Sequence, residues 1–200
     1  MDAVPGVKAR IVDLLVSHLR GYVGFTRKEV ARVLARFGDD EASVEKSGIP
    51  GICIVHTRLD NREVVARCKA LHREAPATFR FAIKWVPVDF WCAKDLDALV
   101  ALIGTRVAPR IAPHETWALD VEKRDWDVHR AADIVGRLAA AIDRVVQLKA
   151  PDCRVHVDVL RGVVAVSVLK RGETFSVHAS APDRVAAPLV SGVARVLPVD

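Results

Sequence analysis

Cations gather at one point of the sequence. Lys123 and Arg124 are adjacent at the end of a predicted strand, and Arg130 lies in the first turns of the predicted helix that follows. The first N–H groups of a helix lack partners and its dipole is positive at that end, so an anion is stabilised there. These residues predict a phosphate-binding site. Single cations on other predicted strands extend the basic surface: Lys84, Arg154 and Lys170.

An ion-paired surface is the alternative interpretation of the same cations. Acidic residues stand close to them in the sequence: Asp125, Asp127 and Asp133. Arg124 and Arg130 would then neutralise these carboxylates, and exposed ion pairs contribute little to the free energy of folding. The residues alone leave both interpretations open.

Trp126 stands directly beside the cations. An exposed indole there could stack on a nucleobase, which contributes ~1–3 kcal/mol per base. The same ring could instead belong to the core, and both roles stay open. The other tryptophans lie in apolar stretches and are expected in the core: Trp85, Trp91 and Trp117.

His156 and Asp158 alternate on one predicted strand, so their side chains share a face of the sheet. Such a pair could hold a metal or transfer a proton, but a solvated or hydrogen-bonded sheet surface is its commoner role. Asp120 and Glu122 also share a strand face, beside cations that neutralise them. The chain has no phosphate-binding Walker sequence, strand-associated GxGxxG, nucleophile elbow, HExxH or CxxC pair. We therefore expect no catalytic residue, no metal and no cofactor.

A strand, a helix and a hairpin position these residues. We expect the strand over 117–124, the helix over about 128–149 and the β-hairpin over 154–170, with its turn at Arg161 and Gly162. Apolar residues of the helix recur at steps of three and four, which places them on one stripe, and Pro151 ends it. Gly162 supplies the positive φ of a two-residue turn. One face of the hairpin should pack on the helix, and the other should meet solvent or a partner.

The preceding residues show the order β-α-β-β-α-β of a ferredoxin-like unit. Strands are expected at about 7–19, 42–46, 52–57 and 79–86, and helices at 27–37 and 62–74. Thr26 and Glu29 predict a capping box for the first helix, and Asp60 caps the second. Further on, we expect a junction at 89–93, an amphipathic helix at 94–107, a strand within 172–178 and an irregular end.

Four ordered motifs resemble the THUMP domain. They are Lys84-Trp-Val-Pro-Val-Asp89, Glu122-Lys123-Arg124, Val145-Val-Gln-Leu-Lys-Ala-Pro-Asp152 and Val155-His-Val-Asp-Val159. In that family a strand ending in Lys-Arg leads to a helix, a "VDLxxPD"-like junction and a "VxVxV" strand. The resemblance covers about residues 80–178. The sequence departs from it where Val-Gln-Leu replaces the common Val-Asp-Leu, so no function is attached to an acid there.

The resemblance implies an α/β (α+β) fold, with a ferredoxin-like domain at 1–88 and a THUMP-like αβαββ domain at 89–200. It also implies RNA contact near Lys123 and Arg124, with tRNA as the partner and its acceptor stem and 3′ end as the target. The chain is similar to a stand-alone adaptor that presents tRNA to a separate modification enzyme. An acetyltransferase that acts on cytidine is the suspected partner. The adaptor itself would be no enzyme.

Charge is divided unevenly along the chain. Residues 1–80 carry 14 Lys and Arg against 10 Asp and Glu, whereas residues 81–200 carry 16 against 15. A nucleic-acid site in the second part therefore depends on local arrangement. No apolar stretch approaches the ~20 residues of a membrane span, and no signal-peptide pattern begins the chain. We expect a cytoplasmic protein with reduced cysteines; a structural disulfide is the alternative.

Two other classes of function stay open. A small enzyme acting on RNA or a nucleotide would use His156 and Asp158 and would place them in a concave pocket. A scaffold protein without RNA affinity would expose a large apolar patch, for example on the open face of the N-terminal sheet.

Overall fold

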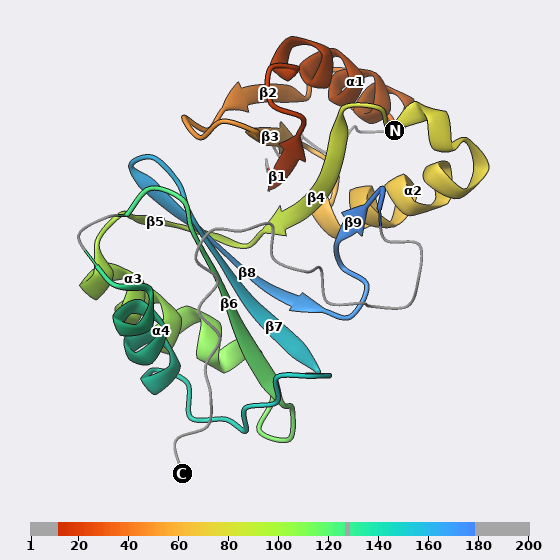
Figure 1. Cartoon of the computed structure of the whole chain (residues 1–200). Helices are drawn as coiled ribbons and strands as arrows, with labels where there is room; N and C mark the ends of the chain where they lie inside the picture. Colours follow the sequence, from red (N-terminus) through yellow and green to blue (C-terminus); the bar gives the residue numbers. More distant parts are fainter. Residues whose placement is uncertain (1–11, 127–128, 179–200) are drawn as a thin grey trace, which may run out of the picture.

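The chain folds around two β-sheets (Figure 1), and the computed structural model describes residues 12–126 and 129–178. The first sheet has the order β2-β3-β1-β4-β9, and the second has the order β5-β8-β7-β6. Helices cover one face of each sheet, and the other two faces meet between the sheets. The expected α/β class is confirmed. Within the described ranges no helix is long and apolar enough to cross a membrane.

The first unit has the predicted ferredoxin-like order. Its elements are β1 (Val12–His18), α1 (Val23–Arg36), β2 (Ser43–Lys46), β3 (Ile52–Thr57), α2 (Asn61–Glu74) and β4 (Ala82–Val88). These strands pair in antiparallel fashion, with β1 in the centre between β3 and β4. Asp60 caps α2 as expected, because its carboxylate accepts the N–H groups of Arg62 and Glu63. The strand expected within 172–178 is β9 (Phe175–Ser176), which returns to pair with β4.

The expected capping box at the first helix is wrong. Helix α1 begins at Val23, one turn before the predicted start, and Tyr22 is its N-cap residue. The Thr26 hydroxyl donates to the Tyr22 carbonyl at 2.9 Å. The Glu29 carboxylate does not cap the helix; it accepts the N–H groups of Arg80 and Ala82 at the beginning of β4. Both side chains of the predicted capping box therefore make other contacts.

The second unit contains β5 (Phe90–Ala93), α3 (Leu96–Leu102), β6 (Trp117–Lys123), α4 (Ala131–Ala140), β7 (Cys153–Val159) and β8 (Val163–Lys170). Strands β6 and β7 are parallel, and the other pairs are antiparallel. The predicted hairpin is confirmed, and Gly162 has a φ of +86° at its turn. The stretch expected as a junction contains β5, which pairs with β8. Helix α3 continues through a π-type turn, Ile103–Val107, into a 3₁₀ turn, Ala108–Arg110.

Helix α4 is much shorter than predicted. It ends at Ala140 rather than near 149, and its N-cap is Arg130. The chain beyond it runs alongside the start of β6: the Trp117 N–H donates to the Val145 carbonyl at 3.0 Å, and Gln147 N–H donates to the Trp117 carbonyl at 2.9 Å. These residues complete backbone hydrogen bonds of the edge strand, which competes with continuing the helix. Residue 128, the predicted start, lies outside the described residues.

A small apolar core joins the two sheets. Leu15, Val86 and Val88 of the first sheet pack against Leu160 and Leu169 from the hairpin. The hairpin face that was expected to meet solvent or a partner is therefore covered by the first sheet. The open face of the N-terminal sheet, on which a scaffold protein would expose an apolar patch, is occupied in the same way.

Candidate nucleic-acid interface

Lys123 and Arg130 flank the connection between β6 and α4. Lys123 is half-buried at the last position of β6, and Arg130 is exposed at the N-cap of α4. The Arg130 carbonyl accepts the N–H groups of Asp133 and Ile134, and no side chain caps the helix. Within the described ranges no carboxylate pairs with either cation. Two unpaired cations thus bracket a helix end that also favours an anion.

Arg124 is held in an ion pair instead. Its Nε lies 2.6 Å from Asp158 Oδ1, and its Nη2 lies 3.6 Å from a Glu122 carboxylate oxygen. Burial lowers the pKa of the guanidinium, but the charges of Asp158 and Glu122 outweigh it and raise the pKa. The sequence predicts Arg124 as an RNA contact, and an ion pair with a carboxylate close in sequence is the alternative. Its partner comes from the neighbouring strand β7, because the parallel register sets Glu122 opposite Asp158.

His156 and Asp158 are buried together between the sheets. His156 Nε2 lies 3.0 Å from Asp158 Oδ2, and the Asp158 side chain is only 5% exposed. Burial raises the pKa of Asp158, but hydrogen bonds and charge from His156 and Arg124 outweigh it and hold the pKa well below its usual range. The pair therefore has the hydrogen-bonded role. It does not face solvent, whereas an active site on this strand would have to be open to a substrate.

Three further predicted cations lie on separate strands. Arg154 Nη1 is 3.2 Å from Asp120 Oδ2, and the Lys170 ammonium pairs with Glu115. Lys84 is half-buried on β4, where it lies opposite Ser176 of β9. The structure therefore does not assemble all the predicted basic residues into one surface.

Trp126 lies in the core of the second unit, with 3% of its surface exposed. Its ring makes an edge-on contact with His129 at 5.2 Å between centroids. Of the two roles left open by the sequence, the core role describes its position. The other tryptophans differ: Trp85 and Trp117 are buried as expected, whereas Trp91 is half-buried and donates to Asp13 at 2.5 Å.

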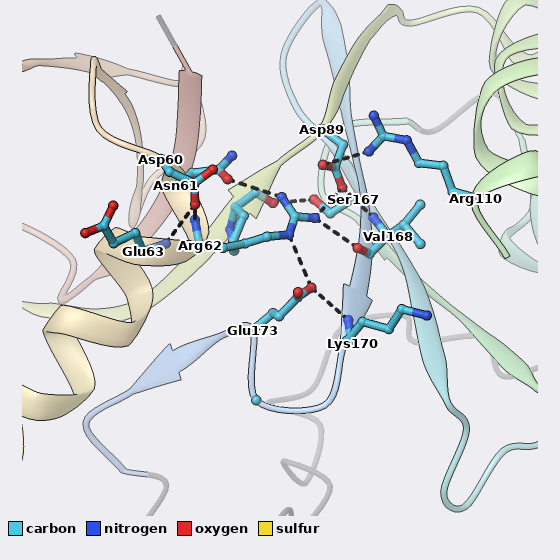
Figure 2. A network of polar contacts seen from close by, with 12 residues as sticks. Asp60, Asn61, Arg62, Glu63, Asp89, Arg110, Ser167, Val168, Lys170 and Glu173 are labelled. Carbon is cyan, nitrogen blue, oxygen red and sulfur yellow. Dashed lines mark hydrogen bonds and ion pairs between the residues drawn. The ribbon is translucent and has the colours of Figure 1, made fainter. Parts of the chain in front are cut away.

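A polar network closes the junction between the two units (Figure 2). Arg62 donates to Asp89 at 2.9 Å and to the Val168 carbonyl at 3.0 Å, and Arg110 lies 3.0 Å from the other Asp89 oxygen. Glu173 accepts from Arg62 at 3.3 Å. The cavity beside this network is about 490 Å³. Its cations face their own carboxylates, so the network joins the units and presents no excess of positive charge. These contacts cannot be predicted from the sequence, because the partners come from distant elements.

The excess charge of the first 80 residues collects on α1. Exposed cations on this helix outnumber acids, of which it has one: Arg27, Lys28, Arg32 and Arg36 stand against Glu29. The charge excess of this part of the chain is evident from the sequence, but its position on the fold is not. The available signal was the spacing of Phe25, Arg32 and Arg36, which puts them on one face of the helix.

All four cysteines are free: Cys53, Cys68 and Cys153 are buried, and Cys92 is half-buried. Within the described part of the chain, no group of three or more His, Cys, Asp or Glu side chains could hold a metal ion.

Solved structures share this architecture. PH1313 from Pyrococcus horikoshii superposes with a TM-score of 0.59 at 11% identity, over 80% of this chain and 54% of its own. TrmN from Thermus thermophilus superposes with a TM-score of 0.51 at 17% identity, over 80% of this chain and 45% of its own. A 4-thiouridine synthetase in complex with RNA and ATP superposes with a TM-score of 0.50 at 13% identity, over 84% of this chain and 42% of its own. At such identities the likeness shows the fold alone, and the fold is THUMP-like.

The chain spans about half the length of these solved structures. No protein-family model matches the sequence. No curated protein matches it either.

Proposed function

We propose that this protein binds tRNA and presents its acceptor stem and 3′ end to a separate modification enzyme. The observation that carries the proposal is a pair of cations, Lys123 and Arg130, on either side of the β6–α4 connection, neither of which pairs with a carboxylate of the described residues. Phosphate groups are the anions that a helix end with flanking cations selects. A shape-reading RNA protein needs such contacts and few base-specific donors.

The fold supports the same proposal. One solved structure with this fold is described as a 4-thiouridine synthetase bound to RNA. The resemblance of the Glu122-Lys123-Arg124 motif to the THUMP domain points to the same end of β6. We infer a non-catalytic role, because His156 and Asp158 are buried in mutual contact and with Arg124. The partner proposed for this adaptor is a cytidine acetyltransferase.

The test compares binding of tRNA with and without its 3′-terminal CCA, at physiological salt. We expect tight binding that weakens when the 3′ end is removed. Lys123→Ala/Arg130→Ala should weaken binding and reduce the slope of log affinity against log salt by about 1–2, since each phosphate contact contributes about 0.7–0.9. Arg124 is left unchanged because its loss would leave the buried carboxylate of Asp158 without its charged partner and destabilise the fold.

A matched control removes two exposed cations from the first unit, Lys46→Ala/Arg73→Ala. This control changes net charge equally, so it should leave the salt slope and the 3′-end preference nearly unchanged. Equal weakening by both double variants, with no preference for the 3′ end, would refute a localised tRNA site. The modification partner is tested separately, by deleting the protein and measuring modified nucleosides in tRNA; unchanged levels of all of them would exclude the adaptor role.

A further inference from the structure

Three aromatic rings form an exposed group on the first unit. Phe25 is 58% exposed and Tyr22 is 45% exposed, and both stack on the half-buried Phe81. The ring centroids lie 5.2 Å apart for Phe25 and Phe81, with an interplanar angle of 26°. Tyr22 and Phe81 lie 5.4 Å apart at 24°. Large aromatic side chains are normally buried, so a stacked group with open faces indicates a binding surface.

The backbone fixes this aromatic group. Leu19 N–H donates to the Phe81 carbonyl at 3.4 Å, and Tyr22 N–H donates to the Leu19 carbonyl at 3.2 Å. Glu29 accepts the N–H of Phe81 at 3.2 Å and that of Ala82 at 2.9 Å. The rings are therefore carried by a helix start and a strand start that are tied together, which lowers the entropy lost when a ligand binds.

A groove with positive charge adjoins the rings. Its volume is about 430 Å³, and it lies between one face of α1 and the α2–β4 connection. Its lining includes Phe25 and Phe81 and the exposed arginines Arg32, Arg36 and Arg80. The Arg80 guanidinium lies 6.0 Å from the centroid of the Phe81 ring. Rings and cations thus share one continuous surface.

The charge of this groove is not compensated. Across the ranges that the structure describes, no carboxylate forms an ion pair with Arg32, Arg36 or Arg80. Glu29 is the only acid in the lining, and it is buried and occupied by backbone N–H groups of the β4 start. Figure 1 shows α1 on the side of the first sheet that faces away from the second sheet. The groove is therefore separate from the polar network at the junction.

We propose that this surface, the aromatic groove, binds single-stranded RNA, with bases stacked on Phe25 and Tyr22 and phosphates bound by Arg32, Arg36 and Arg80. Every base has a π face, whereas phosphates supply the negative charge that three unpaired arginines require. A duplex buries its base faces in its own stack and cannot use the rings. The inference rests on the proposed function, and it adds a second contact that distinguishes unpaired RNA from duplex.

The experiment measures binding of the full chain to a labelled single-stranded octaribonucleotide ending in CCA and to a blunt RNA duplex of equal length. Phe25→Ala should weaken binding of the single strand about tenfold, since stacking of one base contributes ~1–3 kcal/mol, and should leave duplex binding unchanged. Phe25→Trp keeps a ring and should restore the affinity. Val145→Ala, which removes an exposed apolar side chain on the second unit, is the control and should change neither.

Two arginine substitutions on helix α1 test the contribution of charge at the groove. Arg32 lines the groove, whereas Arg27 is exposed on the opposite face of α1. Arg32→Gln should weaken single-strand binding several-fold more than Arg27→Gln, although both remove one charge. Photocrosslinking should also attach the oligonucleotide to the tryptic peptide 21–27, which holds both exposed rings.

Unchanged single-strand binding by Phe25→Ala, or equal losses for single strand and duplex, would overturn the inference and assign the rings to a protein contact. This failure is distinguishable from failure of the proposed function. If tRNA binding still depends on Lys123 and Arg130, only the aromatic groove is refuted. If no RNA binds at physiological salt, the proposed function fails as well.

Discussion

Arg62 and Asp89 join helix α2 to the chain segment that enters the second sheet. Arg62 Nη2 lies 2.9 Å from Asp89 Oδ2, and the same oxygen accepts the Val168 N–H of β8 at 2.7 Å. The other Asp89 oxygen is 3.0 Å from Arg110, whose guanidinium lies over the Phe90 ring at 4.4 Å. One carboxylate therefore receives donors from three separate parts of the chain.

Replacing this carboxylate should loosen the junction. In Asp89→Asn the size is kept, but the charge is lost and an N–H group can face a guanidinium. We expect the free energy of unfolding in urea to fall by about 2–4 kcal/mol. Asp97→Asn is the control, because Asp97 is 81% exposed and pairs with an exposed arginine; it should cost less than about 1 kcal/mol. Equal losses in the two variants would contradict this assignment.

Replacing each of two glycines by alanine should change the free energy of unfolding in opposite directions. Gly162 has a φ of +86° and nothing within 4 Å of a Cβ built on it, so Gly162→Ala carries a purely conformational cost of about 1–2 kcal/mol. Gly136 lies inside α4, is exposed and also has open space. Gly136→Ala should stabilise the protein by up to about 1 kcal/mol. Thermal unfolding of both variants measures the difference, and a destabilising Gly136→Ala would disprove the helical argument.

Local patterns predicted the order of the elements but not all of their limits. The hairpin was predictable because Gly162 determines the turn and alternating valines determine the strands. The end of α4 was not, because the apolar stripe continues through Val145 and Val146 although this segment instead follows the edge of β6. Strand β5 was missed because its four residues acquire strand structure only by pairing with β8.

The candidate site was predictable only where its parts are close in sequence. Lys123 and Arg130 were identified from a strand end and a helix start seven residues apart. The partner of Arg124 was not, because Asp158 is brought to it by a parallel pairing between distant strands. The aromatic groove required Phe25 and Phe81 to meet, and no sequence periodicity relates a helix to a strand so far along the chain.

Asp158 should contribute to acid sensitivity. Its pKa is held below the usual range in the folded protein, so its contribution to stability is fully present above the unfolded pKa of about 4 and is lost as the pH falls below it. Asp158→Asn should lower the free energy of unfolding by about 3 kcal/mol at pH 7 and by much less at pH 2.5. Urea titrations across this range give both values. A constant difference between the proteins would show that the pKa of this carboxyl is the same in the folded and unfolded states.

Trp126 should matter for folding and not for RNA binding. Its ring is buried among core residues, so Trp126→Phe should lower the free energy of unfolding by about 1–2 kcal/mol by leaving a cavity. The affinity for tRNA should stay within about twofold, because a buried ring offers no face to a base. Urea unfolding and tRNA titration of the same preparation test both statements. Weakened binding with unchanged stability would instead support a stacking role.

Replacing Glu29 distinguishes whether positive charge or the position of the rings governs RNA binding at the aromatic groove. Its two carboxylate oxygens accept the N–H groups of Arg80 and Ala82, both at 2.9 Å, and thereby hold the start of β4 against α1. Glu29→Gln removes one acceptor and should cost about 2–3 kcal/mol of stability, measured by urea unfolding. If positive charge alone governed single-strand binding, loss of this acid would strengthen it. We expect weaker binding at a temperature where the variant is folded, because Phe81 is no longer held beneath Phe25 and Tyr22; stronger binding would show that the stacked rings do not contribute.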